Sequence, residues 1–278
     1  MSGTGKQRGI EQCIAKHLEN YEIFYTKKAG DASRLSKEAV NNNIAAVIAV
    51  GGDGTVNECL SGLVNTKTAL GVIPCGSGNG FAYHIGMKRK IEQAIIQLKD
   101  TRIEQIDSCS ANGAPFINVS GIGFDAHIAN LFNGLKERGF INYVRLILKE
   151  LSYKPQKYTL RYNETQKKVS AYLIAFANAS QYGNDARISP MADIKDGLLD
   201  FVIVKNFPKW RIPLFLFKIV TGKAHLSRYV EIIRSKSMQI NADNTLLHLD
   251  GEPYKADNPV KIKLIPKSLK ILIPNGKE

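Results

Sequence analysis

Residues 47–58 read Val47-Ile48-Ala49-Val50-Gly51-Gly52-Asp53-Gly54-Thr55-Val56-Asn57-Glu58. An unbroken apolar run over residues 44–50 leads directly into a glycine-rich turn, and a segment with helical spacing follows. Such a run, bounded by turn residues and flanked by predicted helices, is typical of a central parallel strand covered on both faces. We therefore expect an α/β layer structure around this stretch.

The glycine-rich turn has the composition of a phosphate-binding loop. Gly51, Gly52 and Gly54 allow close backbone approach and leave amide hydrogens that can point at a ligand. The helix that follows adds a positive N-terminal dipole, and the Thr55 hydroxyl can donate to a phosphate oxygen. Asp53 would repel a phosphate unless it orients a magnesium ion, a water molecule or the attacking hydroxyl. The alternative is that Asp53 is only the N-cap of the helix.

A second glycine-rich turn, Cys75-Gly76-Ser77-Gly78-Asn79-Gly80, follows a second apolar run over residues 69–73. Turns that follow adjacent parallel strands lie together at the carboxyl edge of the sheet, where α/β proteins bind ligands. The pair is therefore more specific than either turn alone. Neither turn has the spacing of a Walker loop or of a dinucleotide-binding fold.

Composition restricts the class of protein and of partner. The chain has 278 residues, 44% of them hydrophobic, and its 38 Lys and Arg exceed its 25 Asp and Glu by 13. This balance excludes intrinsic disorder and predicts an anionic partner. The basic residues are dispersed and no recognition motif is present, so we do not expect nucleic acid. The four cysteines form no C-x-x-C pair, which favours reduced thiols over a zinc site or disulfides, and no apolar stretch is long enough to span a membrane.

The pattern of predicted secondary structure changes near residue 107. Before it, predicted helices (7–20, 33–40, 55–63) alternate with predicted strands, including one over residues 21–26. After it, short alternating β-rich runs predict an antiparallel sandwich interrupted by helices near residues 142–151 and 210–220. We therefore expect an α/β domain over residues 1–106 and a β-sandwich over residues 107–266. The strand-like run at 269–273 can return to either domain.

Three motifs carry a resemblance to a known family. They are G-G-D-G-T-x-N-E at 51–58, P-x-G-S-G-N at 74–79 and Asp250-Gly251-Glu252. Their order and separation resemble those of the diacylglycerol kinase catalytic family, which also holds bacterial lipid kinases and the sphingosine and ceramide kinases and is distantly related to NAD kinases. The resemblance covers nearly the whole chain. It implies an NAD-kinase-like N-terminal α/β domain that binds ATP and a C-terminal β-sandwich that binds the lipid, with residues 267–278 returning to the first domain.

The resemblance also implies roles for individual residues. Glu252 corresponds to the proposed general base that takes the proton from the lipid hydroxyl. We expect Asp53, the second catalytic residue, to offset developing charge together with magnesium. A carboxylate within reach of the hydroxyl suits the role of base, although a D-G-E pattern alone is also typical of a hairpin turn. The residues implied to bind the nucleotide are Ser2, Gly3, Thr26, Gly51, Gly52, Gly54, Thr55, Asn57, Glu58, Gly76, Ser77 and Asn79.

Two further sites follow from the family pattern. Asp196 matches a ligand of a structural magnesium ion, with main-chain oxygens near Asp193 and Leu198 assisting and Asp107 linked through water. Oxygen ligands are what this ion prefers. Asp125, in Gly123-Phe124-Asp125-Ala126, matches an acidic residue that meets the polar head of the lipid. Without the family, Asp107 and Asp196 would pass as turn residues and Asp125 as part of a solvated turn.

The sequence departs from the family pattern in two places. Of the opening motif N-P-x-S-G only Ser2 and Gly3 are matched, so we expect the first strand and part of the phosphate cradle to be missing. Many bacterial members have Asp after the Asn of the second turn, where this chain has Gly80. That form is closer to the sphingosine and ceramide kinase branch.

We expect an ATP- and Mg²⁺-dependent lipid kinase that phosphorylates the hydroxyl of diacylglycerol or of a sphingoid-type lipid. It would be cytoplasmic and peripheral at a membrane surface, and whether it forms a homodimer is left open. The alternatives are an NAD kinase, because G-G-D-G-T is shared, and a non-catalytic nucleotide- or lipid-binding protein. The segment 207–218 mixes aromatic, aliphatic and basic side chains, as an interfacial anchor would; a packed helix is the alternative.

Overall fold

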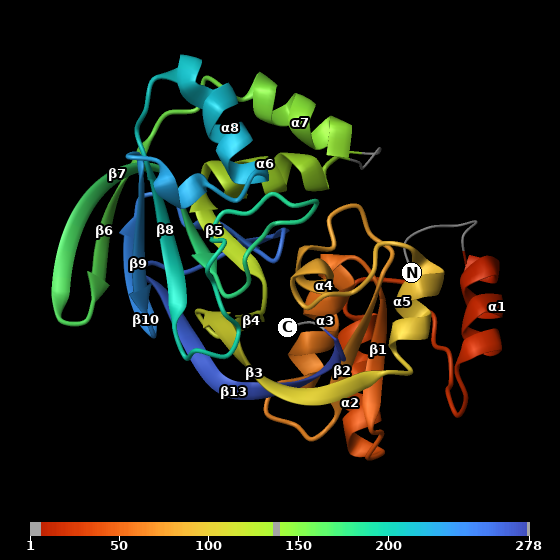
Figure 1. The fold of residues 1–278 in the computed structure, drawn as a ribbon. Helices are drawn as coiled ribbons and strands as arrows, with labels where there is room; N and C mark the ends of the chain where they lie inside the picture. Colours follow the sequence, from red (N-terminus) through yellow and green to blue (C-terminus); the bar gives the residue numbers. More distant parts are fainter. Residues whose placement is uncertain (1–6, 136–139, 277–278) are drawn as a thin grey trace. The chain divides into compact units, whose positions relative to one another are not determined.

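The computed structural model describes residues 7–135 and 140–276 (Figure 1). Its contacts divide the chain into two compact units, Met1–Ile106 with Lys267–Glu278, and Asp107–Pro266. Two long strands, β3 (Thr101–Ala111) and β13 (Val260–Pro274), belong partly to each unit. The run at 269–273 is the end of β13 and lies in the first unit.

The first unit is a small parallel sheet with helices. Strand β1 (Ala46–Gly51) pairs in parallel with β2 (Ala69–Pro74), from Ala46 opposite Ala69 to Gly51 opposite Pro74. On its other side, β2 pairs in parallel with β13 at Ile271. The helices of the unit are α1 (Gln7–His17), α2 (Asp31–Asn41), α3 (Asp53–Leu63), α4 (Gly80–His84) and α5 (Ile91–Gln97).

Two sequence predictions for this unit are wrong. The central, fully buried strand is β2; β1 has β2 as its only partner within residues 7–135 and 140–276. The apolar residues of β1 have another use, because Ile48 and Val50 pack half-buried against the cluster formed by α1 and α5. The segment 21–26 is irregular rather than a strand, since no described strand lies beside it to take its hydrogen bonds, and Phe24 is 62% exposed.

The second unit is an antiparallel β structure. Its strands follow the order β13-β10-β6-β7-β5-β11-β12, with β8 beside β7, β9 beside β8, and β4 beside β3. The N-terminal half of β7 pairs with β6, and its C-terminal half pairs with both β5 and β8 after a register shift between Ala171 and Leu173. The strand bounds are β4 (Ala114–Phe116), β5 (Val119–Gly123), β6 (Gln156–Tyr162), β7 (Thr165–Ala177), β8 (Leu199–Lys205), β9 (Val230–Ser235), β10 (Ser237–Ala242), β11 (Leu246–Leu249) and β12 (Glu252–Lys255).

Helices interrupt the second unit at three places. They are α6 (Phe124–Asn133), α7 (Phe140–Lys149) and α8 (Ile212–Val220), with 3₁₀ turns η1 (Lys209–Arg211) and η2 (Ala224–Leu226) flanking α8. The helices expected near 142–151 and 210–220 are thus present, whereas α6 was not predicted. None of the helices within the described ranges combines the length and apolar character needed to cross a membrane. An α/β unit combined with an antiparallel β unit confirms the predicted fold class.

Candidate active site

The two glycine turns lie against each other at the carboxyl ends of β1 and β2. A Cβ atom on Gly76 would lie 2.5 Å from the Cα of Gly52, and one on Gly52 would lie 3.1 Å from the Cα of Gly76. The Cys75 N–H donates to the Gly51 carbonyl over 2.9 Å. Only a residue without a side chain allows two backbones to approach this closely. The predicted meeting of the turns at one sheet edge is therefore confirmed.

Asn79 shapes the second turn. It adopts a left-handed conformation, with φ 54°, and is buried. Its Oδ1 accepts from the Gly76 N–H over 2.9 Å, while its Nδ2 donates to the Gly76 carbonyl over 2.7 Å and to the Tyr83 hydroxyl over 3.1 Å. The Asn79 side chain therefore makes its hydrogen bonds within the second turn and the helix that follows it. Gly76 and Ser77 are exposed at the surface.

The first turn leads directly into α3. Gly52 is the N-cap, so the alternative that Asp53 is the N-cap is wrong; Asp53 is the first residue of the helix. Its Oδ1 accepts from the Phe81 N–H over 3.4 Å, which links the two turns. Thr55 lies so close to Gly51 that a Cβ there would be 2.3 Å from the Thr55 Oγ1. Gly54 and Thr55 are both partly accessible to solvent.

The remaining residues predicted to bind the nucleotide lie outside the two glycine turns. Glu58, on α3, accepts from the Ala32 N–H over 3.2 Å and so ties α3 to the start of α2. Asn57 is half-buried on α3, and Thr26 is half-buried in the irregular segment before α2. Ser2 and Gly3 lie outside the described residues.

Asp250 and Gly251 form the two-residue turn between β11 and β12, with φ 50° and 94°. The Asp250 carboxylate is buried and accepts from the N–H groups of Ile117 and Asn118 over 3.0 and 2.8 Å. The motif therefore forms a hairpin turn, which was the alternative interpretation of the D-G-E pattern. The buried Asp250 carboxylate anchors this turn in the interior. Glu252 follows at the exposed start of β12, and its carboxylate has no hydrogen-bond or ion-pair partner among the residues that the structure describes. It is accessible to accept a proton.

Asp125 lies in a buried hydrogen-bond network. It sits in the first turn of α6 and is 6% exposed, so the alternative of a solvated turn is wrong. Its Oδ2 accepts from the Tyr182 hydroxyl over 3.1 Å and contacts His248 Nε2 at 3.2 Å. The Gly251 N–H donates to His248 Nδ1 over 3.2 Å, which leaves Nε2 as the protonated nitrogen facing Asp125. The network therefore joins Asp125 to the turn that precedes Glu252.

Tyrosines surround this carboxylate. Burial, and secondarily the charge of Asp125, raises the pKa of Tyr143 and Tyr182 well above the ordinary value; the pKa of Tyr153 rises to about 12 for the same reasons. Burial also raises the pKa of Tyr158, whose hydroxyl is buried and lacks a hydrogen-bond partner within the described part of the chain. These phenols therefore stay protonated at neutral pH, and Tyr182 uses its O–H on the Asp125 carboxylate.

His248 and Tyr182 were missed in the sequence. His248 stands two residues before Asp250, which is the one local signal that marks it. Tyr182 carries no such signal, because 57 residues separate it from Asp125.

The predicted structural magnesium site does not fit the residues present. One oxygen of Asp196 accepts from the Leu198 N–H over 2.9 Å, and the other is paired with the guanidinium of Arg234. Arg234 also contacts the buried Asp200 carboxylate over 3.1 Å. The carboxylates of Asp107 and Asp193 accept backbone N–H groups of Gly197 and Lys195, both over 2.9 Å. An arginine thus supplies the positive charge that a magnesium ion would bring to this turn.

A different group of three possible ligands forms in the first unit. Cys13 and His17, four residues apart on α1, approach Glu92 of α5 so that one ligand atom from each lies within 4.8 Å of the others. The spacing of the cysteines along the sequence did not predict this group, because its third member, Glu92, lies on another helix. It is the one such group within residues 7–135 and 140–276.

Comparison with known proteins assigns both parts of the chain. Residues 1–111 match the family described as "Diacylglycerol kinase catalytic domain", and residues 118–273 match the "YegS C-terminal NAD kinase beta sandwich-like domain". The chain is 33% identical to the "Probable lipid kinase YegS-like" of Chromohalobacter salexigens, over 91% of this chain and 84% of that protein. It is 31% identical to the "Diacylglycerol kinase" of Mycobacterium tuberculosis, over 88% and 82%.

A solved structure shows the same fold. The crystal structure of a putative diacylglycerol kinase from Bacillus anthracis str. Sterne superposes with a TM-score of 0.81, at 24% identity, over 99% of this chain and 92% of that one. The paired glycine turns, the two matching domains and these relatives agree. The chain belongs to the diacylglycerol kinase family, and it is a kinase that transfers phosphate to an alcohol group.

Proposed function

We propose that this protein is an ATP-dependent lipid kinase that transfers the γ-phosphoryl group to the hydroxyl of diacylglycerol or of a sphingoid-type lipid. The observation that carries the proposal is the contact between Gly52 and Gly76, which packs two exposed backbone turns together at one sheet edge. Paired turns of this kind bind phosphates through N–H groups and a helix N-terminus.

The first unit supplies the phosphate side of the reaction. The start of α3, the Thr55 hydroxyl and the exposed turn at Gly76 and Ser77 hold the phosphates. ATP arrives as its magnesium complex, in which the cation offsets phosphate charge. Asp53 bridges the turns and keeps their spacing through Phe81. Positioning of this kind accounts for most of the catalysis in phosphoryl transfer.

The second unit supplies the acceptor side. The buried Asp125 with its protonated tyrosine neighbours recognises the polar head of the lipid, since a desolvated carboxylate strongly favours a hydrogen-bond donor such as a hydroxyl or an ammonium group. Glu252 accepts the proton of the acceptor hydroxyl as the new oxygen–phosphorus bond forms. The bond from the γ-phosphorus to the bridging oxygen breaks, and ADP leaves with the electron pair.

The two substrates of this reaction are held in different places. An acceptor with acyl chains is held in a bilayer while ATP is dissolved in the cytoplasm, so we propose that the protein works there, attached peripherally to a membrane.

The test is transfer of labelled γ-phosphate from Mg-ATP to diacylglycerol, a sphingoid base, a ceramide and NAD, each offered separately. We expect transfer to a lipid, and Glu252→Gln should abolish it while ATP binding stays near the wild-type value. Transfer to NAD alone would establish an NAD kinase, and ATP binding without transfer to any acceptor would establish a non-catalytic binding protein. Normal turnover of Glu252→Gln would remove Glu252 from the mechanism.

A further inference from the structure

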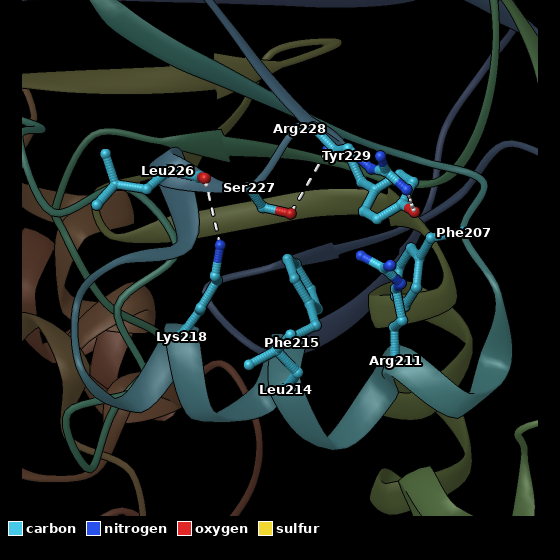
Figure 2. A pocket seen from close by; sticks show the side chains of 9 residues that line it. All are labelled: Phe207, Arg211, Leu214, Phe215, Lys218, Leu226, Ser227, Arg228 and Tyr229. Atoms are coloured by element: carbon cyan, nitrogen blue, oxygen red, sulfur yellow. Dashed lines mark hydrogen bonds between the residues drawn. The ribbon is translucent and has the colours of Figure 1, made fainter.

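A cationic pocket lies in the second unit between α8, η2 and the start of β9 (Figure 2). Its volume is about 250 Å³, and three of the side chains that line it are cations, Arg211, Lys218 and Arg228. Figure 2 shows Arg211 and Lys218 rising from α8 on either side of Phe215 toward the segment that carries Arg228. None of the predicted site residues lines this pocket.

The charge of this region is one-sided. Residues 205–229 contain six Lys and Arg and no Asp or Glu. Lys205 pairs with Glu231 over 2.8 Å. The other five make no ion pair with any residue that the structure describes; they are Lys209, Arg211, Lys218, Lys223 and Arg228. A concave surface lined by one sign of charge concentrates ligands of the opposite sign.

The hydrogen bonds in the pocket leave donors to spare. The Arg211 Nε is buried and has no acceptor in the described structure. Lys218 Nζ reaches the Leu226 carbonyl over 3.2 Å, and Arg228 donates to the Tyr229 hydroxyl over 2.7 Å. The Arg211 guanidinium is held 4.6 Å from the ring centre of Trp210. A buried donor without an acceptor is costly, and a phosphate oxygen would satisfy it.

Exposed apolar side chains lie in the pocket and next to its cations in the sequence. Leu214 and Leu226, which line the pocket, are 52% and 63% exposed. Trp210 and Phe217, the sequence neighbours of Arg211 and Lys218, are 73% and 63% exposed. Ile212, Phe215 and Ile219 of α8 pack half-buried against the unit, and Phe215 also lines the pocket. The helix is therefore packed on one side, as the packed-helix alternative predicts, and carries exposed apolar side chains elsewhere.

We infer that this face binds the surface of an anionic bilayer. Arg211, Lys218 and Arg228 hold the phosphate of an anionic phospholipid in the pocket, and the exposed side chains of Trp210 and Phe217 enter the boundary between headgroups and acyl chains. Cations beside apolar side chains on one helix are the composition of interfacial helices. The inference builds on the proposed function only in naming the bilayer as the partner; the residues that carry it are separate from the phosphate turns and from Asp125.

Vesicle cosedimentation without ATP tests this surface. Wild-type protein should bind phosphatidylcholine vesicles that contain phosphatidylglycerol, and not pure phosphatidylcholine, with binding weakened by salt. The triple variant R211Q/K218Q/R228Q should lose about fivefold in affinity for each charge removed, about a hundredfold in all. The matched control removes three exposed lysines elsewhere, Lys37, Lys99 and Lys168, each as Lys→Gln.

Apolar insertion is tested separately. Trp210→Ser and Phe217→Ser should weaken binding to the same vesicles, while Ile103→Ser, at a residue 59% exposed on β3, should leave it unchanged. Equal loss in the lysine control, or wild-type binding by the triple variant, would overturn the inference. Displacement from vesicles by soluble glycerol 3-phosphate at equal phosphate concentration would also overturn it, because the pocket would then be a phosphate site without a bilayer role.

The result that would contradict the proposed kinase function differs from the results that would overturn this membrane-binding surface. Transfer to acceptor dispersed in neutral detergent micelles should be unchanged in the triple variant, and transfer to the same acceptor in anionic vesicles should fall with binding. Vesicle binding without phosphoryl transfer by wild-type protein would contradict the proposed function and leave this surface in place.

Discussion

Gly76→Ala tests the phosphate cradle. The new Cβ would lie 2.5 Å from the Cα of Gly52 and 2.9 Å from the Oδ1 of Asn79, and both neighbours are fixed. Carbon atoms pack at about 3.5–4.0 Å, so the two turns must separate by about 1 Å. A displacement of about 1 Å in a positioning element costs about a hundredfold in rate. The substitution should therefore lower kcat/KM for ATP by about that factor.

The measurement is the initial rate of transfer against ATP concentration at a saturating acceptor, with thermal unfolding followed by circular dichroism. Overpacking one methyl group costs about 1–3 kcal/mol, so the protein should still unfold cooperatively. Gly9→Ala is the matched control, because a Cβ at Gly9 meets no atom within 4 Å. A folded Gly76→Ala protein with wild-type kcat/KM would refute the reasoning that the contact between the turns positions the phosphates.

Three further predictions concern the second unit. Asp125→Asn should raise KM for the acceptor by about 10- to 100-fold, because a hydrogen bond to a charged group contributes about 1.5–3 kcal/mol, and KM for ATP should not change; steady-state kinetics with each substrate varied checks both. Chelation of magnesium should not lower the melting temperature, and a melting temperature that falls with chelator would restore the structural ion. Arg234→Ala should lower the unfolding free energy by about 1–3 kcal/mol, since it removes the ion pair of the buried Asp200 and leaves that carboxylate, among the described residues, with the Ser189 hydroxyl alone. Hydrogen bonds from Lys167 and Lys205 lower the pKa of Glu231, so Glu231→Gln should cost about 0.5–1 kcal/mol at neutral pH, and denaturant titrations should show the difference vanishing as pH falls through that lowered pKa.

Local sequence was sufficient to predict the two glycine turns and the helix start. Gly51, Gly52 and Gly76 follow apolar strands directly, and both the turn and the helix start are decided within a few residues. The meeting of the turns followed from the parallel pairing of adjacent strands. Strand order was not local information, which is why the apolar run of β1 was mistaken for the central strand.

Residues that depend on distant partners were not predictable in the same way. Asp125 was named from the family pattern, but its burial depends on His248, 123 residues later, and on Tyr182. Arg234, which is 38 residues from Asp196 in the sequence, supplies the positive charge beside that carboxylate. Nothing near either aspartate in the sequence indicates its partner, because these contacts form only when separate strands and turns pack.

The central claim is that the acceptor is a lipid alcohol. Its most direct test offers diacylglycerol micelles and NAD together to the protein with Mg-ATP labelled at the γ-phosphate, and separates the products by organic extraction and chromatography. We predict that the label enters the extracted lipid as a phosphomonoester and does not enter NAD. Label in the aqueous dinucleotide, with none in the lipid, would contradict the account.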